Sequence, residues 1–217
     1  HDFNNALTAI LGNAQLLLYT AKDEDSKETL RTIEKVAKDS AQTVRRLQDF
    51  TRKNAHKEIF RLDVNSIIRE AMEMTRPKWK DDVQRRGFQI EMVSILEEIP
   101  LVGGHTSELR EVITNMIFNA IEAMPEGGKI EIRTYRRKED VCIRIADTGV
   151  GMTEEVRKKA FEPFFTTKPF TNTGLGLSMS YGIVKRLGGD IEVESKVGQG
   201  TTFTILVPVR GERKGGV

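Results

Sequence analysis

Two narrow apolar stripes in the first fifty residues constrain the fold of this chain more than any other feature. The first recurs at spacings of four and three residues, and the second follows the polar stretch 21–26 with heptad-like spacing. Their members are Phe3, Leu7, Ile10, Ala14 and Leu17, then Leu30, Ile33, Ala37, Ser40, Val44, Leu47 and Thr51. The spacing predicts two helices in an antiparallel hairpin. Because one such hairpin buries little surface alone, we expect two copies to form a four-helix bundle, and hence a homodimer.

Beyond the charged stretch 52–58, the apolar periodicity changes repeatedly between that of strands and that of helices. The periodicity predicts strands at 59–62, 88–93, 129–136, 141–146, 191–195 and 202–207, and helices at 64–75, 109–124 and 174–187. Pro77 is expected to end the first of these helices, and Thr106 to cap the second. The order predicts an α+β fold with helices on one face of a sheet. We therefore expect a hairpin at 1–54, a second domain at 59–210 and a disordered tail at 211–217.

Composition excludes several classes of protein. Apolar residues make up 38% and charged residues 30% of the chain, as in ordinary globular proteins. The net charge of +2, with both signs well mixed, gives no reason to expect nucleic acid as a partner. The single cysteine, Cys142, is compatible with a reducing cytoplasm. No apolar run is long enough to cross a membrane, so we expect no membrane contact by these residues.

The first residue is a histidine and not a methionine. We therefore expect a fragment of a longer protein, with the hairpin truncated at its N-terminus. An upstream sensor part would then be missing, and the parent could be anchored in a membrane through it.

Two asparagines interrupt the otherwise apolar inner face of the helix expected at 109–124. Asn115 and Asn119 are four residues apart and so lie on the same side of the helix. An amide oxygen at such a place can coordinate Mg²⁺, which prefers oxygen ligands. The alternative is a polar strip that faces solvent.

An acidic and glycine-rich segment, Asp147-Thr-Gly149-Val-Gly151, follows directly after a predicted strand. A carboxylate at a strand end can accept a hydrogen bond from the exocyclic amine of adenine, and the glycines would let the backbone approach the base. One alternative is a simple turn. Another is the Asp-Thr-Gly triplet of aspartic proteases, which need a second such triplet to share a proton.

Two further segments carry residues that packing alone would not select. The loop 161–168 contains three phenylalanines and ends at Lys168. We expect this loop to fold back onto the domain, which would let Lys168 reach a phosphate. The segment 173–178 has the pattern Thr-Gly-Leu-Gly-Leu-Ser and opens a predicted helix, where free backbone N–H groups form an anion site. Taken singly, each segment has an ordinary structural explanation.

In this order, the four segments resemble the N, G1, F and G2 boxes of histidine kinases, a branch of the ATPase superfamily that includes gyrase, heat-shock chaperones and mismatch-repair ATPases. The resemblance covers about residues 59–210 and implies an α/β sandwich that binds ATP and Mg²⁺. The residues it assigns to ATP are Asn115, Asn119, Glu122, Asp147, Gly149, Gly151, Lys168, Gly174, Leu175, Gly176, Leu177 and Thr202, with Asn119 also on Mg²⁺. The threonine pair Thr201–Thr202 on the last strand resembles the family's late contact near adenine. Hydrolytic members have a glutamate at the position of Asn115 that activates water. An asparagine cannot act as that base, which favours transfer to another acceptor.

The acceptor is expected at the start of the hairpin, in the run His1-Asp2-Phe-Asn-Asn5. This run resembles the H-box of histidine kinases. A neutral imidazole is a good nucleophile at physiological pH, and Asp2 could act as its general base or hold its tautomer. In the family, the position of Asn5 supports phosphatase activity by orienting a water. The alternative for His1 alone is the remnant of a purification tag.

The resemblance as a whole implies a two-component sensor histidine kinase core. It would autophosphorylate His1 and pass the phosphoryl group to an aspartate of a response-regulator receiver domain, docked around Asn5, Thr8 and Gly12. A hydrolytic ATPase module and a dimeric aspartic protease are the rival classes. The first should carry glutamate at position 115, and the second should be an all-β chain.

Overall fold

The computed structural model describes residues 2–51, 59–85, 87–167 and 173–209, without the side chains of 2–5, 39, 42–51, 82 and 84. The chain divides into two compact units, residues 1–56 and 57–217. Each unit is described by itself. Lys168, the tail 211–217 and the side chains of His1, Asp2 and Asn5 lie outside the described residues.

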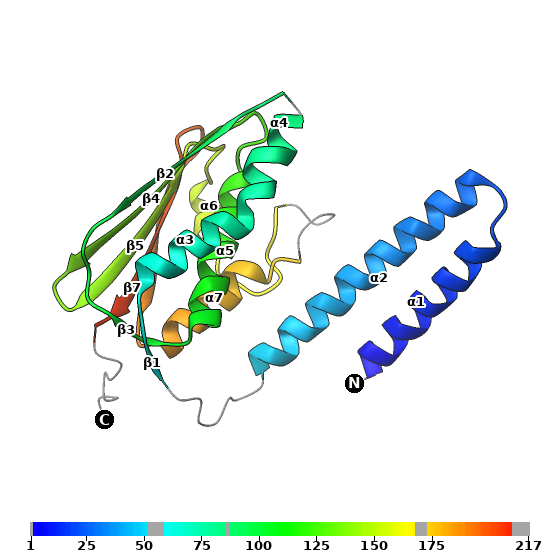
Figure 1. The fold of residues 1–217 in the computed structure, drawn as a ribbon, viewed down its shortest axis with the longest axis horizontal. Coiled ribbons are helices and arrows are strands. Elements are labelled where there is room, and N and C mark those ends of the chain that lie inside the picture. The colour runs from blue at the N-terminus through cyan, green and yellow to red at the C-terminus, as the bar shows by residue number, and fades with distance from the viewer. Residues whose placement is uncertain (1, 52–58, 86, 168–172, 210–217) are drawn as a thin grey trace. The chain divides into compact units, whose positions relative to one another are not determined.

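The first unit is an antiparallel helical hairpin, as the apolar stripes predict. It consists of α1 (Asp2–Thr20) and α2 (Glu24–Thr51) (Figure 1). Asp23 precedes α2, and its carboxylate accepts the backbone N–H of Ser26 at 2.7 Å, which satisfies a free donor at the helix start. Ala14 and Ala37 are buried between the helices. Gln15 adds a hydrogen bond from its amide to the carboxylate of Glu34 across the pair, at 2.9 Å.

The second unit contains a five-stranded sheet with the strand order β2-β4-β5-β7-β6. Its strands are β2 (Ile90–Leu96), β4 (Gly128–Arg137), β5 (Asp140–Asp147), β6 (Asp190–Lys196) and β7 (Gly200–Pro208). The pairing of β2 with β4 is parallel, and the other pairings are antiparallel. A second, two-stranded sheet pairs β1 (Phe60–Leu62) with β3 (Val102–Gly104).

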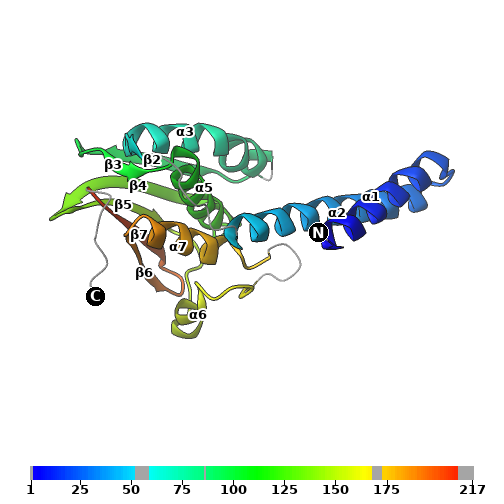
Figure 2. The same ribbon diagram turned by 90° about the horizontal axis from the view of Figure 1, so that it is seen from below.

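The helices α3 (Val64–Arg76), α5 (Thr106–Glu122) and α7 (Gly176–Arg186) cover one face of the large sheet (Figures 1 and 2). The stripe predicted on α5 is the buried one: Leu109, Val112, Ile113, Met116, Ile117 and Ala120. These side chains pack against the inner face of the strands, where alternate residues such as Ile130, Ile132, Ile143, Ile145 and Ile205 are buried. The unit is therefore a two-layer α/β sandwich, as the resemblance implies.

Several elements differ from the periodicity-based expectations, among them the strand β3, which those expectations do not include. The helical path does not end at Pro77 but continues as a π-helix (Pro77–Asp82) and α4 (Val83–Arg85). A short helix, α6 (Glu154–Lys159), interrupts the region expected to be a loop. The N-cap of α5 is His105, with no side-chain hydrogen bond, so Thr106 is the first helical residue and not the cap. None of the helices in the described parts of the chain has the length and apolar character needed to cross a membrane.

Candidate nucleotide-binding site

Both asparagines of α5, Asn115 and Asn119, are partly buried. Asn115 donates from Nδ2 to the hydroxyl of Ser180 on α7 at 3.3 Å. A Cβ placed on Gly176, the first residue of α7, would lie 3.9 Å from Cγ of Asn115. The start of α7 and the middle of α5 therefore meet at Asn115, and the solvent-facing strip considered as the alternative is not what the structure shows.

Asn119 has an amide that the fold does not use fully. Its Nδ2 atom is buried and has no hydrogen-bond partner among the described residues. A buried polar group without a partner is rare in proteins and indicates a place where a ligand or water supplies the missing contact. Glu122, one turn further on, has an exposed side chain.

Asp147, the last residue of β5, is almost completely buried, with 9% of its surface exposed. Its Oδ1 atom accepts two backbone N–H groups, from Gly149 at 2.8 Å and from Thr201 at 3.2 Å. Within the described part of the chain, Oδ2 has no hydrogen-bond donor. Burial raises the pKa of the carboxyl group, and the two N–H groups oppose this by stabilising its charge. The carboxylate is thus held in one orientation with a free acceptor atom.

The glycines after Asp147 are required by close backbone approach. A Cβ on Gly149 would lie 2.5 Å from the carbonyl oxygen of Ala123. Gly151 has a φ of +66°, and a Cβ there would collide with the carbonyl oxygen of Lys196. Hydrogen bonds fix the same loop on both sides, from Val150 N to Ala123 O at 2.9 Å and from Gly198 N to Val150 O at 2.8 Å. The segment is therefore clamped between α5 and the β6–β7 turn and is more than a surface turn.

The threonine pair at the start of β7 is divided between the two faces of the sheet. Thr201 pairs with Asp147 in register, is buried, and shares the inner face with it. Thr202 lies on the outer face, where its hydroxyl accepts a hydrogen bond from Arg144 at 3.4 Å. Side chains alternate along a strand, so a shift of one residue changes the face. Of the two threonines expected near adenine, Thr201 therefore lies beside Asp147, and Thr202 lies on the opposite face.

The phenylalanine-rich loop folds back only in part. The ring of Phe161 packs against Tyr181 of α7 at 5.1 Å and against Phe203 of β7 at 6.3 Å between centroids. Phe164, in contrast, is 63% exposed and has a φ of +66°. Its N–H donates to the carbonyl of Gly174 at 3.1 Å, which joins the end of this loop to the segment that opens α7.

The glycine-rich segment 173–178 leads into α7, as predicted. Gly174 has a φ of +69°, and a Cβ there would lie 2.5 Å from the carbonyl carbon of Phe164. Leu175 is buried, Leu177 packs against the core, and Gly176 begins the helix beside Asn115. The first backbone N–H groups of α7 are therefore near the amide of Asn115, an arrangement that suits an anion.

Two small polar residues of this region are not identified from the sequence. They are Ser180, which receives the hydrogen bond of Asn115, and Ser195 on β6, which contacts Thr201. Ser180 could have been found, because a serine on the apolar stripe of α7 needs a polar partner. No group of three or more His, Cys, Asp or Glu residues in the described ranges could hold a metal ion.

Taken together, the fold and these contacts define a nucleotide-binding α/β sandwich joined to a helical hairpin. Residues 104–211 match the family described as histidine kinase-, DNA gyrase B- and HSP90-like ATPases, and residues 1–56 match the His Kinase A phospho-acceptor domain. The chain therefore belongs to the histidine kinases and is a histidine kinase catalytic core.

Individual relatives agree with this assignment. The chain is 35% identical to sensor kinase CckA of Brucella abortus (strain 2308) over 99% of its own length and 24% of that protein. It is 32% identical to the signal transduction histidine-protein kinase AtoS of Escherichia coli (strain K12) over 96% of its length and 33% of that protein. The chain thus spans about a quarter to a third of these curated relatives.

Solved structures show the same architecture. The catalytic domain of histidine kinase ThkA superposes with a TM-score of 0.63 at 29% identity, over 73% of this chain and 100% of that one. Full-length ShkA, solved in complex with AMPPNP, shares the fold with a TM-score of 0.78 at 23% identity, over 96% of this chain and 44% of that one. ThkA in complex with the response regulator TrrA gives a TM-score of 0.72 at 24% identity, over 99% and 60% of the two chains.

Proposed function

We propose that the second unit binds ATP together with Mg²⁺, and that the γ-phosphoryl group passes to His1 and then to an aspartate of a response-regulator receiver domain. The observation that carries this proposal is the constrained carboxylate of Asp147. It keeps one acceptor atom free, on the same inner face as Thr201 and next to a glycine loop clamped to α5. An acceptor-only group of this kind suits the exocyclic amine of adenine.

The phosphates are assigned to the other side of the site. Asn115, the start of α7 at Gly176 and the segment Gly174–Leu177 surround this place, and Lys168, which lies outside the described residues, would add a positive charge. Backbone N–H groups at a helix start favour negative charge through the helix dipole. On the side of the base, Gly149 and Gly151 would let the backbone approach the adenine. Glu122, at the end of α5, is a further candidate contact to ATP.

Mg²⁺ is assigned to Asn119. The side chain is not fully exposed, and its amide oxygen is a ligand that Mg²⁺ accepts. Its buried Nδ2 atom, which has no partner among the described residues, would remain free to donate to a phosphate oxygen. One protein oxygen fits this ion because Mg²⁺ usually takes its other ligands from water and substrate phosphates. When bound, the ion would neutralise charge on the phosphates, and this chain would contribute the position of the amide.

Transfer, in preference to hydrolysis, follows from the residue at position 115. The asparagine is neutral and already donates to Ser180, so it offers water no base. The imidazole of His1 would attack the γ-phosphorus, the bond to ADP would break, and Asp2 would hold the reactive tautomer. Asn5 would orient a water that hydrolyses the phosphoryl group from the receiver's aspartate, which is the phosphatase activity. These three side chains lie outside the described residues, so their roles rest on the H-box resemblance.

The partners are proposed on the same basis. Histidine kinase ThkA has been crystallised with a response regulator, and this chain would use a receiver domain of that class, docked near Asn5, Thr8 and Gly12. The apolar residues exposed on the isolated hairpin support a homodimer. A sensor part upstream of residue 1 would supply the signal.

The proposal is tested by incubating the 217-residue chain with γ-³²P-ATP and Mg²⁺. We expect a label on the protein that is stable in base and lost in acid, as a phosphohistidine is. Asn119→Ala should lose the label, because it removes the oxygen ligand, whereas Asn119→Asp keeps an oxygen and should retain part of it. His1→Gln should bind ATP and remain unlabelled. Steady release of free phosphate without a labelled protein would contradict the kinase proposal.

A further inference from the structure

Ser195 is the centre of a small hydrogen-bond network behind Asp147. It lies on β6, directly opposite Thr201 of β7 in register. Its Oγ atom accepts the backbone N–H of Met152 at 2.8 Å. The same atom is 3.1 Å from the carbonyl oxygen of Gly200, to which it donates, and 2.9 Å from the hydroxyl oxygen of Thr201. A half-buried serine thus contacts three residues: Met152 after the clamped glycine loop, Gly200 at the start of β7, and Thr201 beside Asp147.

Counting donors fixes the direction of these bonds. A serine hydroxyl has one hydrogen to donate and two lone pairs to accept with. The carbonyl oxygen of Gly200 can only accept, so it takes the hydrogen of Ser195. The N–H of Met152 occupies one lone pair. The remaining contact, with Thr201, is satisfied only when Thr201 donates to Ser195. Its own hydroxyl oxygen is then left as an acceptor, on the same sheet face as the free Oδ2 atom of Asp147.

We propose that Ser195 is a positioning residue that fixes Thr201 as a hydrogen-bond acceptor and so makes the base site selective for an amino group over a carbonyl group. This inference rests on the proposed nucleotide-binding function of the second unit. Two neighbouring acceptors, Asp147 and Thr201, complement an exocyclic amine, which has two hydrogens to donate. A 6-oxo purine presents a carbonyl oxygen at that position and meets two acceptors, which repel it.

Without the Ser195 hydroxyl, the Thr201 hydroxyl would no longer be held in its acceptor orientation. The Thr201 hydroxyl would then lose its acceptor and be free to rotate and donate, for example to a 6-oxo group. The matched pair of variants is Ser195→Thr and Ser195→Val. Both add a β-branched side chain that suits a strand, and they have nearly the same shape, but only the threonine keeps the hydroxyl. Any difference between them therefore reports the hydrogen bonds and not the added bulk.

The experiment measures the dissociation constants of ADP and inosine diphosphate, with Mg²⁺, by calorimetry on the 217-residue chain. Diphosphates avoid turnover. We expect the wild type and Ser195→Thr to prefer ADP to the same extent. In Ser195→Val, the preference should fall by about tenfold, which is the scale of one hydrogen bond. Ser94→Val, a serine-to-valine change on the opposite edge strand β2, should leave both constants unchanged.

A double-mutant cycle separates positioning from simple support. If Ser195 acts through Thr201, then Ser195→Val should not change the ADP preference further in a Thr201→Val background, because no hydroxyl remains to reorient. Equal weakening of both nucleotides by Ser195→Val, or additive effects in the cycle, would overturn the inference while leaving the proposed function intact. A wild-type chain that binds neither nucleotide would overturn the proposed function and, with it, this inference.

Discussion

At the scale of single residues, substitution of Asp147 can weaken nucleotide binding without disrupting the fold. In Asp147→Asn, the amide oxygen can still accept the N–H groups of Gly149 and Thr201, so the loop should keep its structure. The negative charge offered to the adenine amine is lost. We expect ATP to bind about 10- to 100-fold more weakly, the range for a hydrogen bond to a charged group. Calorimetry on both proteins measures this, and equal affinities would exclude the assigned role of Asp147.

The same substitution has a pH dependence with a defined sign. Burial raises the pKa of Asp147 above its ordinary value of 3.8. Between 3.8 and the raised pKa of the folded protein, the native state holds a proton that the unfolded state has lost. Stability therefore falls as pH rises through this window and stays lower above it. Asparagine does not titrate, so Asp147→Asn should gain stability relative to the wild type across the window.

Urea denaturation across a pH series tests this, read by the fluorescence of Trp79. This is the single tryptophan of the chain and packs against the core of the second unit. The difference in unfolding free energy should be smallest at and below pH 3.8 and should widen in favour of the variant as pH rises. A difference that does not depend on pH would contradict the raised pKa.

Asn115 decides between transfer and hydrolysis. Asn115→Glu would place a carboxylate where hydrolytic relatives of the family have one, and Asn115→Gln has nearly the same size without a base. We expect the glutamate variant to release phosphate on the order of tenfold faster than the wild type, well below the 10²–10⁴-fold that a well-placed general base provides. The glutamine variant should show no gain. A coupled assay for phosphate measures both, and equal rates in the two variants would count against this explanation.

The residue types of the site could be predicted from the sequence, but not all of their orientations. Asp147, Asn115 and Asn119 were identified because acidic and amide groups at those places have no packing role. The threonine pair 201–202 is also evident from the sequence, but which of the two shares a face with Asp147 is not, since β7 begins at Gly200 and not at the expected residue 202. The face of a strand residue depends on its register with neighbouring strands, which a local pattern does not contain. Ser195 was missed for the same reason, since its partners are distant in sequence.

At the scale of elements, the clamp between the glycine loop and the β6–β7 turn can be tested with two glycines. Gly151 and Gly198 both have positive φ, but only a Cβ on Gly151 would meet backbone, whereas Gly198 has open space. Gly198→Ala should cost about 1 kcal/mol of unfolding free energy, from backbone conformation alone. Gly151→Ala should cost about 3 kcal/mol or more, because the loop must also move away from Lys196. Urea denaturation read at Trp79 measures both, and similar costs would argue against the clamp.

Periodicity predicted most elements that bury a face, but it missed the three-residue strand β3 and the helix α6. In the strands of the large sheet and in α5, the apolar residues recur with the same period as the buried positions, so the existence and type of these elements could be predicted. The helix α6 has no buried residue and therefore no apolar pattern to detect. Pro77 was expected to end α3, but its φ of −57° is helical; its missing N–H and the clash of its ring with the carbonyl four residues earlier are what disturb the α-helical ladder. The π-helix that follows accommodates this irregularity, which propensity alone does not predict.

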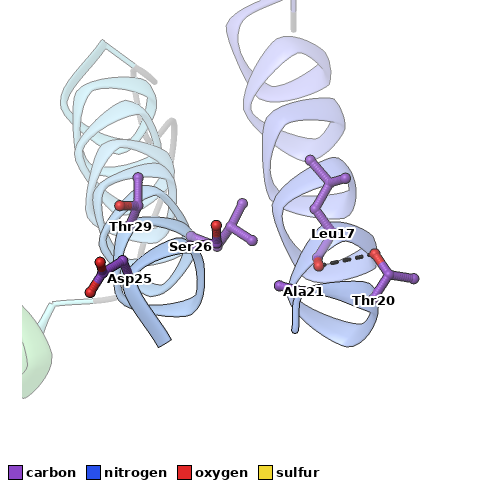
Figure 3. Close-up of a pocket in the computed structure, with 7 residues that line it drawn as sticks. Leu17, Thr20, Ala21, Asp25, Ser26 and Thr29 are labelled. Atoms are coloured by element: carbon purple, nitrogen blue, oxygen red, sulfur yellow. Dashed lines mark hydrogen bonds between the residues drawn. The ribbon is translucent and has the colours of Figure 1, made fainter. Parts of the chain in front are cut away.

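At the scale of the whole molecule, the hairpin leaves apolar surface that a single copy does not cover. Leu17 and Ile33 belong to the predicted stripes, yet they are 56% and 41% exposed. Leu17 also lines a shallow pocket near the turn between α1 and α2, together with Ala21 and Thr29 (Figure 3). Its carbonyl accepts the Thr20 hydroxyl at 3.1 Å. The exposed apolar surface of Leu17 and Ile33 favours a second hairpin as its cover.

This reasoning predicts that Leu17→Glu and Ile33→Glu each weaken the proposed dimer. Burying one such side chain contributes about 1.5–3 kcal/mol, and two-fold symmetry counts each substitution twice. The dissociation constant should therefore rise at least about 100-fold. Light scattering after size exclusion should give twice the 24.5 kDa of one chain for the wild type, and the mass of one chain for the variants at micromolar concentration. Lys35→Glu, an exposed charge reversal on α2 outside the stripe, should remain dimeric. If the wild type itself has the mass of one chain, the proposed dimer is contradicted and the exposed apolar residues serve another contact. Phosphoryl transfer from one copy of the chain to another would then be excluded as well.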